Sequence, residues 1–385
     1  MIPLDPVDLD PLRDRLAGLG RAPTPADVAT AMRAEGRMVS DAALIETVEA
    51  LRRHSVGAGP LEDLLRAPGV TDILVNGPDR VYVDRGAGLE LTGLRFRHDG
   101  EVRQLAQRLA ASVGRRLDDA VPFVDARLPD GSRIHAVLAP LADPGTCISL
   151  RVLGTKTFTL DDCLRSGALH PVGAELLRRM VAARLAFLIS GGTGSGKTTL
   201  LGALLALVPA EERVVIVEDS RELDPGHPHV VRLEARPANA ERAGAVTLTD
   251  LVRQSLRMRP DRLVVGEVRG REICDLLSAL NTGHEGGCGT VHANSAADVP
   301  ARLEALAALG GLDRSALHAQ LAAALHAVVH VSRDETGVRR VSEISVLVRS
   351  ATTGLVHTER AVLFAPDGRV ELDTGGPTLE RLLAR

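Results

Sequence analysis

The sequence predicts an α/β protein whose larger, C-terminal part is a parallel sheet covered by helices. A smaller α+β domain and a short helical extension are expected to precede it. Three observations support this organisation. A glycine-rich loop over 191–196 separates an apolar run from a Leu/Ala-rich helical segment. Beyond it, short apolar runs alternate with helical patterns, which is typical of a parallel sheet. Before it, hairpin signals surround one amphipathic helix, and 385 residues are enough for two domains.

The glycine-rich loop has the spacing of a phosphate-binding loop. It follows the apolar run Leu-Ala-Phe-Leu-Ile-Ser and matches G-x-x-x-x-G-K-[ST]. Glycines let the backbone aim several N–H groups at one anion, and the following helix adds its positive N-terminal end. The predicted nucleotide-binding residues are Gly191, Gly192, Thr193, Gly194, Ser195, Gly196, Lys197, Thr198 and Thr199.

Lys197 and Thr198 have the most specific expected roles in this loop. Lys197 should reach the β- and γ-phosphates, and the Thr198 hydroxyl should bind Mg²⁺. A glycine turn with a solvated lysine is the simpler alternative, but composition argues against it. Only two of the 46 basic residues are lysines, Lys156 and Lys197. Lysine therefore stands where a phosphate loop needs a compact ammonium group.

Composition and charge narrow the class of protein further. Apolar residues make up 45% of the chain, and with no Trp, one Tyr and five Phe its core must be mostly aliphatic. A net charge of −4 gives no sign of general nucleic-acid binding. The first residues lack the pattern of a signal peptide, and no apolar run is long enough to span a membrane. We expect a cytoplasmic protein that associates with a membrane through partners.

The four cysteines form no C-x-x-C pair, so neither a disulfide framework nor a zinc site is indicated.

Residues 1–58 are expected to form a helical N-terminal extension. Thr24-Pro25-Ala26-Asp27 is typical of a helix start, and 41–53 has apolar residues at helical spacing. A poorly ordered acidic tail is the alternative, because residues 1–50 contain five arginines and nine acidic residues.

Residues 59–152 are predicted to form a compact α+β domain. Turn residues separate short apolar runs, which indicates hairpins, and one segment has a clear helical stripe. The expected elements are a short helix over 60–66, a hairpin over 71–83, a helix over 101–113, a hairpin over 127–138 and a strand over 147–152.

Residues 153–160 are predicted to be a linker and 161–385 a phosphate-loop domain. Helices are expected over 159–165 and 172–184 before the loop. Strands over 214–217, 262–265 and 289–292 should follow, with helices over 248–258, 271–281, 296–309 and 315–326 and a strand-rich tail to about 372. The carboxyl ends of the parallel strands should form one edge of the sheet, where such folds bind ligands.

Three of these strand ends place polar side chains near the phosphate loop: Glu218, Glu267 and His292. Phosphoryl transfer to water needs a carboxylate to orient the water, a second at Mg²⁺ and donors for the γ-phosphate. Glu218 and Glu267 fit the two carboxylate roles, and His292 could be a donor. Singly, each has a simpler interpretation as a turn acid or a core histidine. Gly266 also replaces the aspartate of the usual Asp-Glu pair, which on general grounds weakens the site.

Together, these residues resemble the ATPases of the type II/type IV secretion superfamily, and within it those of tight-adherence (Flp-type) pilus assembly. The matching runs are 218–223 (the Asp box), 257–270 (the Walker B region) and 282–295 (the His box). In the first domain, 71–77 and 127–133 also match, so the resemblance covers roughly residues 59–350. The cysteine-rich zinc module of many type II members is absent, which excludes that branch.

The resemblance implies a RecA-like ATPase domain, ATP and Mg²⁺ as cofactors, and a homo-hexamer whose N-terminal domains clamp nucleotide. It implies that Glu218 is the catalytic carboxylate, that Glu267 assists at the metal, and that Gly-Glu is normal in this family. Arg127 and Arg133, and with them Arg151, are expected to reach the γ-phosphate as arginine fingers. Plain solvation of these arginines is the alternative.

The resemblance also implies inner-membrane platform proteins as partners, with no direct contact to nucleic acid. The expected function is a motor that powers pilus assembly or protein secretion. A conjugation-type ATPase that exports DNA or effectors is a second hypothesis. A nucleotide-gated scaffold with little turnover is a third, and the presence of both carboxylates and His292 disfavours it.

Overall fold

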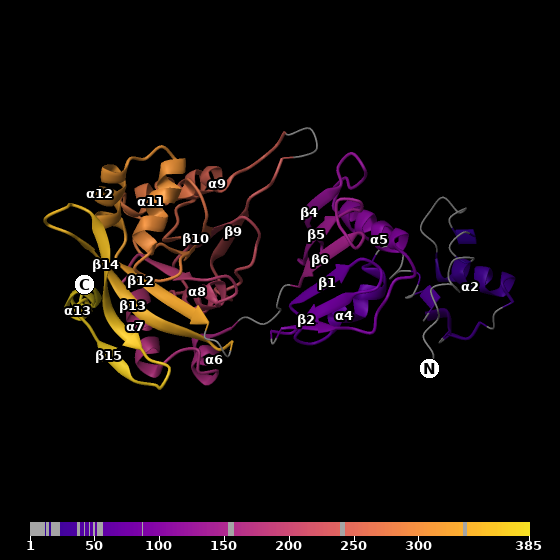
Figure 1. The fold of residues 1–385 in the computed structure, drawn as a ribbon, viewed down its shortest axis with the longest axis horizontal. Helices are drawn as coiled ribbons and strands as arrows, with labels where there is room; N and C mark the ends of the chain where they lie inside the picture. Colours follow the sequence, from indigo (N-terminus) through magenta and orange to yellow (C-terminus); the bar gives the residue numbers. More distant parts are fainter. Residues whose placement is uncertain are drawn as a thin grey trace. The chain divides into compact units, whose positions relative to one another are not determined.

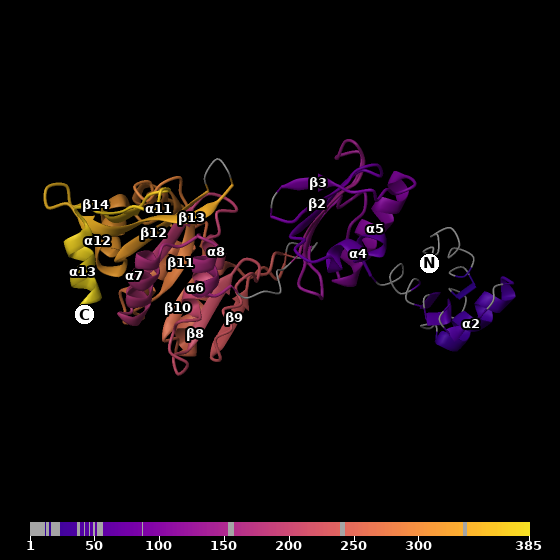
Figure 2. The same ribbon diagram turned by 90° about the horizontal axis from the view of Figure 1, so that it is seen from below.

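The computed structural model describes residues 12, 15–16, 24–36, 39–41, 43–45, 47–48, 51, 57–86, 88–152, 158–238, 243–333 and 337–385. The chain divides into two compact units, Met1–Gly154 and Thr155–Arg385, coloured indigo to magenta and magenta to yellow in Figures 1 and 2. Most of the predicted linker, 153–157, lies outside the described residues. No helix in the described part of the chain is both long and apolar enough to cross a membrane.

The predicted helix start at Thr24 is confirmed. Helix α2 (Pro25–Ala34) begins with a reciprocal capping box, in which the Thr24 side chain accepts from the Asp27 N–H and Asp27 accepts from the Thr24 N–H. Its buried face packs in a small apolar cluster with Leu12, Leu16 and Leu51. The helix predicted over 41–53 falls only partly within the described residues.

The rest of the first unit is an antiparallel sheet whose apolar core is shared with the helix α5 and, to a smaller extent, with η2 and α4. The strands lie in the order β3-β2-β1-β6-β5-β4, and one face alternates buried residues that pack against α5. Both predicted hairpins are confirmed as β1–β2 and β4–β5. The elements are η2 (Gly59–Leu61), α4 (Glu62–Arg66), β1 (Asp72–Asn76), β2 (Val81–Asp84), β3 (Leu89–Leu91), α5 (Asp99–Ser112), β4 (Phe123–Arg127), β5 (Arg133–Val137) and β6 (Cys147–Arg151).

The second unit contains a nine-stranded sheet in the order β15-β14-β13-β12-β7-β11-β10-β8-β9. The strands from β12 to β9 in this order pair in parallel, and β13, β14 and β15 add an antiparallel extension. The strands are β7 (Phe187–Gly191), β8 (Val214–Glu218), β9 (Val230–Glu234), β10 (Arg262–Val268), β11 (Cys288–His292), β12 (Ala327–Arg333), β13 (Arg339–Arg349), β14 (Val356–Phe364) and β15 (Val370–Leu372).

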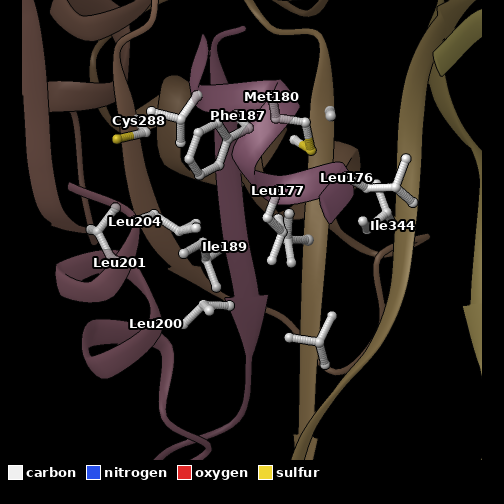
Figure 3. Packing of buried hydrophobic residues seen from close by; sticks show 14 of the residues in the cluster. Leu176, Leu177, Met180, Phe187, Ile189, Leu200, Leu201, Leu204, Cys288 and Ile344 are labelled. Carbon is white, nitrogen blue, oxygen red and sulfur yellow. The ribbon is translucent and has the colours of Figure 1, made fainter. Parts of the chain in front are cut away.

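Helices cover both faces of this sheet. One apolar cluster joins it to α6, α7, α8 and α13, and a second joins it to α9, α10, α11 and α12. Figure 3 shows the first cluster, in which Leu177, Met180 and Leu204 pack around Phe187 and Ile189 of β7. The helices are α6 (Leu160–Arg165), α7 (Pro171–Ala182), α8 (Lys197–Leu205), α9 (Leu248–Ser255) with η3 (Leu256–Met258), α10 (Glu272–Leu280), α11 (Val299–Leu309), α12 (Arg314–Ala324) and α13 (Gly376–Leu383).

The structure differs from the predicted elements at two places that affect the sheet. Strand β10 does not end at Val265 but continues to Val268, so Glu267 lies within the strand. Strand β9 was not predicted. It is an edge strand in which every residue is only half-buried, so it lacks the alternation by which strands are recognised.

Candidate functional site

The predicted phosphate loop connects the end of β7 to the start of α8 and is tightly packed on one side. Gly196 is the N-cap of α8 and has a φ of +99°, which favours glycine. A methyl group on Gly191 would lie 2.2 Å from the Val331 carbonyl oxygen, so only glycine fits there. Gly191, Ser195 and Lys197 are buried, Gly196 and Thr198 are half-buried, and Gly192, Thr193, Gly194 and Thr199 are exposed.

Lys197 is the first residue of α8, and its side chain reaches back to the carbonyl groups of this loop. Its Nζ donates hydrogen bonds to the carbonyl oxygens of Gly191, at 3.0 Å, and Gly192, at 2.7 Å. Burial lowers the pKa of Lys197, nearby Glu267 opposes this shift and Arg269 adds to it. The Ser195 hydroxyl is buried and has no hydrogen-bond partner in the described part of the chain. A desolvated cation, an unsatisfied hydroxyl and a helix N-terminus together fit an anionic ligand such as a phosphate chain.

Glu218 is the last residue of β8, and its side chain is buried. Its two carboxylate oxygens have different surroundings. Its Oε1 accepts hydrogen bonds from the backbone N–H groups of Glu222 and Leu223, both at 3.0 Å. Its Oε2 is buried and has no partner among the described residues. Burial raises the pKa of Glu218 to about 7, although the two N–H groups oppose the shift. A carboxyl group with one anchored oxygen, one open oxygen and a pKa near neutrality can take up and release a proton.

Gly266 is required by the position of Glu218. A methyl group on Gly266 would lie 2.6 Å from Cγ and 3.2 Å from Oε1 of Glu218. On general grounds the absence of an aspartate at 266 was expected to weaken the site; the structure shows that a side chain at 266 would collide with Glu218. The glycine leaves the space that the Glu218 side chain occupies.

Glu267 and His292 lie together on neighbouring strands. His292 Nε2 is 2.5 Å from Glu267 Oε1, in a close approach without the alignment of a full hydrogen bond, and Arg269 donates to the other Glu267 oxygen. The register of the pairing between β10 and β11 shifts between Val265 and Val268, in the stretch of β10 that contains Glu267. Burial and Lys197 lower the pKa of His292, although Glu267 opposes them, so its imidazole is neutral near pH 7.

Arg269 was missed as a site residue by the sequence analysis, although it lies in the Walker B run. Its guanidinium bonds Glu267 and lies 3.8 Å from Asp219 Oδ2, at the end of the Asp-box strand. It therefore bridges the two acidic motifs. The signal that could have identified it was its place directly after the strand that contains Glu267, only two residues further along the chain.

The carboxyl ends of β7, β8, β10 and β11 bring most of the predicted residues to one edge of the sheet. Lys197 is close enough to interact electrostatically with Glu267 and His292: Glu267 opposes the lowering of the pKa of Lys197, and Lys197 contributes to the lowered pKa of His292. The Thr198 hydroxyl and the Glu267 carboxylate are hard oxygen donors of the kind that Mg²⁺ takes, usually with several waters retained. These two residues are the ones that could hold a metal ion here.

Arg127 and Arg133 lie in the first unit, where they face each other across the β4–β5 hairpin. Arg127 Nε donates to the Gly131 carbonyl oxygen at 3.2 Å, and Arg133 makes a two-point contact with Asp125 at 3.1 and 2.7 Å. Arg151 pairs with Asp72 at 3.3 Å. Their approach to a γ-phosphate stays a prediction.

Comparison with known proteins places the chain in a family. Residues 54–359 match the family described as "Type II/IV secretion system protein". A Mycobacterium tuberculosis protein named "Putative conjugal transfer protein" is 57% identical over 316 residues, which span 80% of this chain and 90% of that protein. The conjugal transfer protein TrbB of Rhizobium radiobacter is 32% identical over 280 residues, covering 71% of this chain and 83% of TrbB.

Solved structures support the fold. The X-ray structure of the Legionella pneumophila ATPase DotB superposes with a TM-score of 0.53 over 75% of this chain and 80% of DotB. At 18% sequence identity, this likeness concerns the fold alone.

The raised pKa of Glu218 predicts a particular dependence of stability on pH. The folded protein holds a proton on Glu218 up to about pH 7, whereas an unfolded glutamate loses it near 4.5. Stability from this group is therefore present below pH 4.5 and is lost as pH rises to about 7. Glu218→Gln removes the titration, so its advantage over wild type in free energy of unfolding should grow by roughly 2 kcal/mol from pH 5.5 to pH 8.

Urea unfolding without nucleotide or Mg²⁺ would measure this difference at both pH values. Glu211→Gln, an exposed carboxylate before the same strand, is the matched control and should show no such change. A constant offset between Glu218→Gln and wild type across this range would contradict the raised pKa.

Proposed function

Because the chain belongs to the type II/IV secretion system protein family, we propose that it is a motor that hydrolyses ATP with Mg²⁺. It acts as a ring of six subunits on an inner-membrane platform that assembles a pilus or secretes protein. The observation that supports hydrolysis most directly is Glu218, a buried carboxyl group with one open oxygen at the same sheet edge as Lys197. A protein that only bound nucleotide would have no use for such a costly group.

In this proposal the phosphate loop binds the β- and γ-phosphates. Lys197 exchanges the carbonyl oxygens of Gly191 and Gly192 for phosphate oxygens, and the N-terminus of α8 adds its N–H groups. Mg²⁺, held by Thr198 and through water by Glu267, would neutralise charge that develops on the phosphates.

The remaining side chains act on the attacking water and on the γ-phosphate. Glu218 Oε2 accepts a hydrogen bond from the water and takes its proton, for which a pKa near 7 is well matched. Neutral His292 has one N–H, so it donates to a γ-phosphate oxygen by giving up its contact with Glu267. Arg269 holds the second oxygen of Glu267 and so orients that carboxylate.

The arginines of the first unit complete the proposed site. Arg127 and Arg133 reach the γ-phosphate as arginine fingers, so that hydrolysis is coupled to domain motion. Arg133 must then exchange its contact with Asp125 for the phosphate. The state in which Arg133 contacts the phosphate therefore forms only when nucleotide is bound.

Two cargoes fit the proposal. The Asp-box and His-box runs resemble those of tight-adherence pilus ATPases, which favours pilin assembly. The M. tuberculosis and R. radiobacter relatives are named as conjugal transfer proteins, which favours a conjugation or type IV secretion machine. The proposed chemistry is the same in both.

Replacing the open carboxylate should separate binding from turnover. Glu218→Gln keeps the size and the accepting oxygen but cannot take a proton, so ATP hydrolysis should fall at least about 100-fold while ATP affinity is unchanged. Phosphate release and equilibrium ATP binding measure the two effects. Glu211→Gln should retain both, and full hydrolysis by Glu218→Gln would exclude its catalytic role.

The ring predicts that specific ATPase activity rises with protein concentration as subunits assemble. Arg133→Ala should lower the plateau activity strongly, on the order of 10³-fold if it is an arginine finger. Arg103→Ala, which removes a half-buried arginine of the same unit paired with Asp119, should not. Activity that is flat with concentration, in a sample shown to be monomeric by sedimentation, would contradict action between subunits.

Cross-linked purification from membranes of the host would identify the cargo. Platform proteins and pilins in the mass spectra are expected for pilus assembly. A relaxase or coupling protein would indicate conjugation and leave the hydrolytic site as proposed. Recovery of neither would contradict a role at the membrane.

A further inference from the structure

The strand order places different parts of the sheet on the two sides of β7 and of the phosphate loop that follows it. Glu218, Glu267 and His292 lie on β8, β10 and β11, all on one side of β7, whereas β12 and β13 lie on the other. If the proposed function holds, the γ-phosphate must lie on the side of the carboxylates. The nucleoside end of the nucleotide is then directed toward the β12–β13 hairpin.

This hairpin is in direct contact with the phosphate loop. The Val331 carbonyl oxygen of β12 fills the space where a side chain on Gly191 would stand. Arg339, the first residue of β13, places its Cδ 3.8 Å from the position that a side chain on Gly196 would take. Both views show β13 starting close to α8 (Figures 1 and 2). Arg339 is exposed, so its guanidinium can reach a ligand seated on the loop.

The neighbouring arginines of the hairpin are directed elsewhere. Arg333, which pairs with Arg339 in register, donates through Nε to the Gly337 carbonyl oxygen at 3.2 Å. Arg340 lies on the opposite face of β13 and donates to the Pro366 carbonyl oxygen at 3.2 Å. Among the described arginines of this hairpin, Arg339 is therefore the one placed to contact the ligand.

We propose that Arg339 recognises the nucleoside end of bound ATP by stacking its guanidinium plane on the base. Bases usually stack on aromatic side chains, but residues 327–349 contain no Phe, Tyr or Trp. A guanidinium is planar, weakly hydrated and stacks on flat π-systems, which an ammonium does not. The proposal rests on the proposed function and adds a contact that is separate from the phosphate loop.

The test compares ligands with and without a nucleoside. Full-length wild type, Arg339→Ala, Arg339→Lys and Arg340→Ala are titrated calorimetrically with Mg²⁺-ADP and with Mg²⁺-tripolyphosphate. Arg339→Ala should bind ADP about tenfold more weakly and tripolyphosphate as wild type does. Arg339→Lys should not restore ADP affinity, because it keeps the charge but not the plane. Arg340→Ala, the matched control, should bind both ligands as wild type does.

Each other outcome overturns the proposal. An equal loss for tripolyphosphate would make Arg339 a phosphate contact, and full rescue by lysine would make it a simple charge. Unchanged ADP affinity in Arg339→Ala would remove it from the site. In steady-state hydrolysis KM should rise and kcat stay within about twofold. A wild type that binds ADP but does not hydrolyse ATP would overturn the proposed function alone, and one that binds no nucleotide would overturn both.

Discussion

Parallel pairing of β7 with β11 on one side and β12 on the other is the constraint on which the site depends. Every residue of β7 is buried, with Phe187 and Ile189 facing one helical layer and Leu188 the other. A strand held on both edges and both faces cannot shift in register without exposing an apolar side chain. The phosphate loop at its end is therefore fixed against the neighbouring strand ends, although the loop itself is mostly exposed.

Charge balance around Lys197 is the second organising feature. A buried ammonium group is accompanied by Glu267, and that carboxylate is in turn held by His292 and Arg269. Glu218 stands outside this network, anchored only by backbone N–H groups. The two carboxylates thus have different environments, as is typical of paired acids with different roles.

Much of the fold was predictable, because apolar periodicity and turn residues are local signals. The hairpins about 76–79 and 129–131 and the strands β7, β8, β10 and β11 of the parallel sheet were predicted in this way. Features that depend on distant residues were not. The extension of β10 through Glu267 depends on its pairing with β11, and β9 is recognisable only by its pairing with Glu218 and its neighbours. Arg269, just after β10, has a clear position only once Asp219, just after β8, is placed near it.

The contact between Gly266 and Glu218 makes the two positions depend on each other. A site with Asp-Glu at 266–267 would need a shorter residue at 218 or a different backbone path, because the space above residue 266 is filled. Single substitutions that introduce the commoner Asp-Glu pair should therefore displace the Glu218 side chain rather than simply add a second carboxylate. An engineered exchange between the two arrangements would have to change both strands together. The glycine at 266 and the buried glutamate at 218 therefore belong to a single packing arrangement, and neither can be changed without affecting the other.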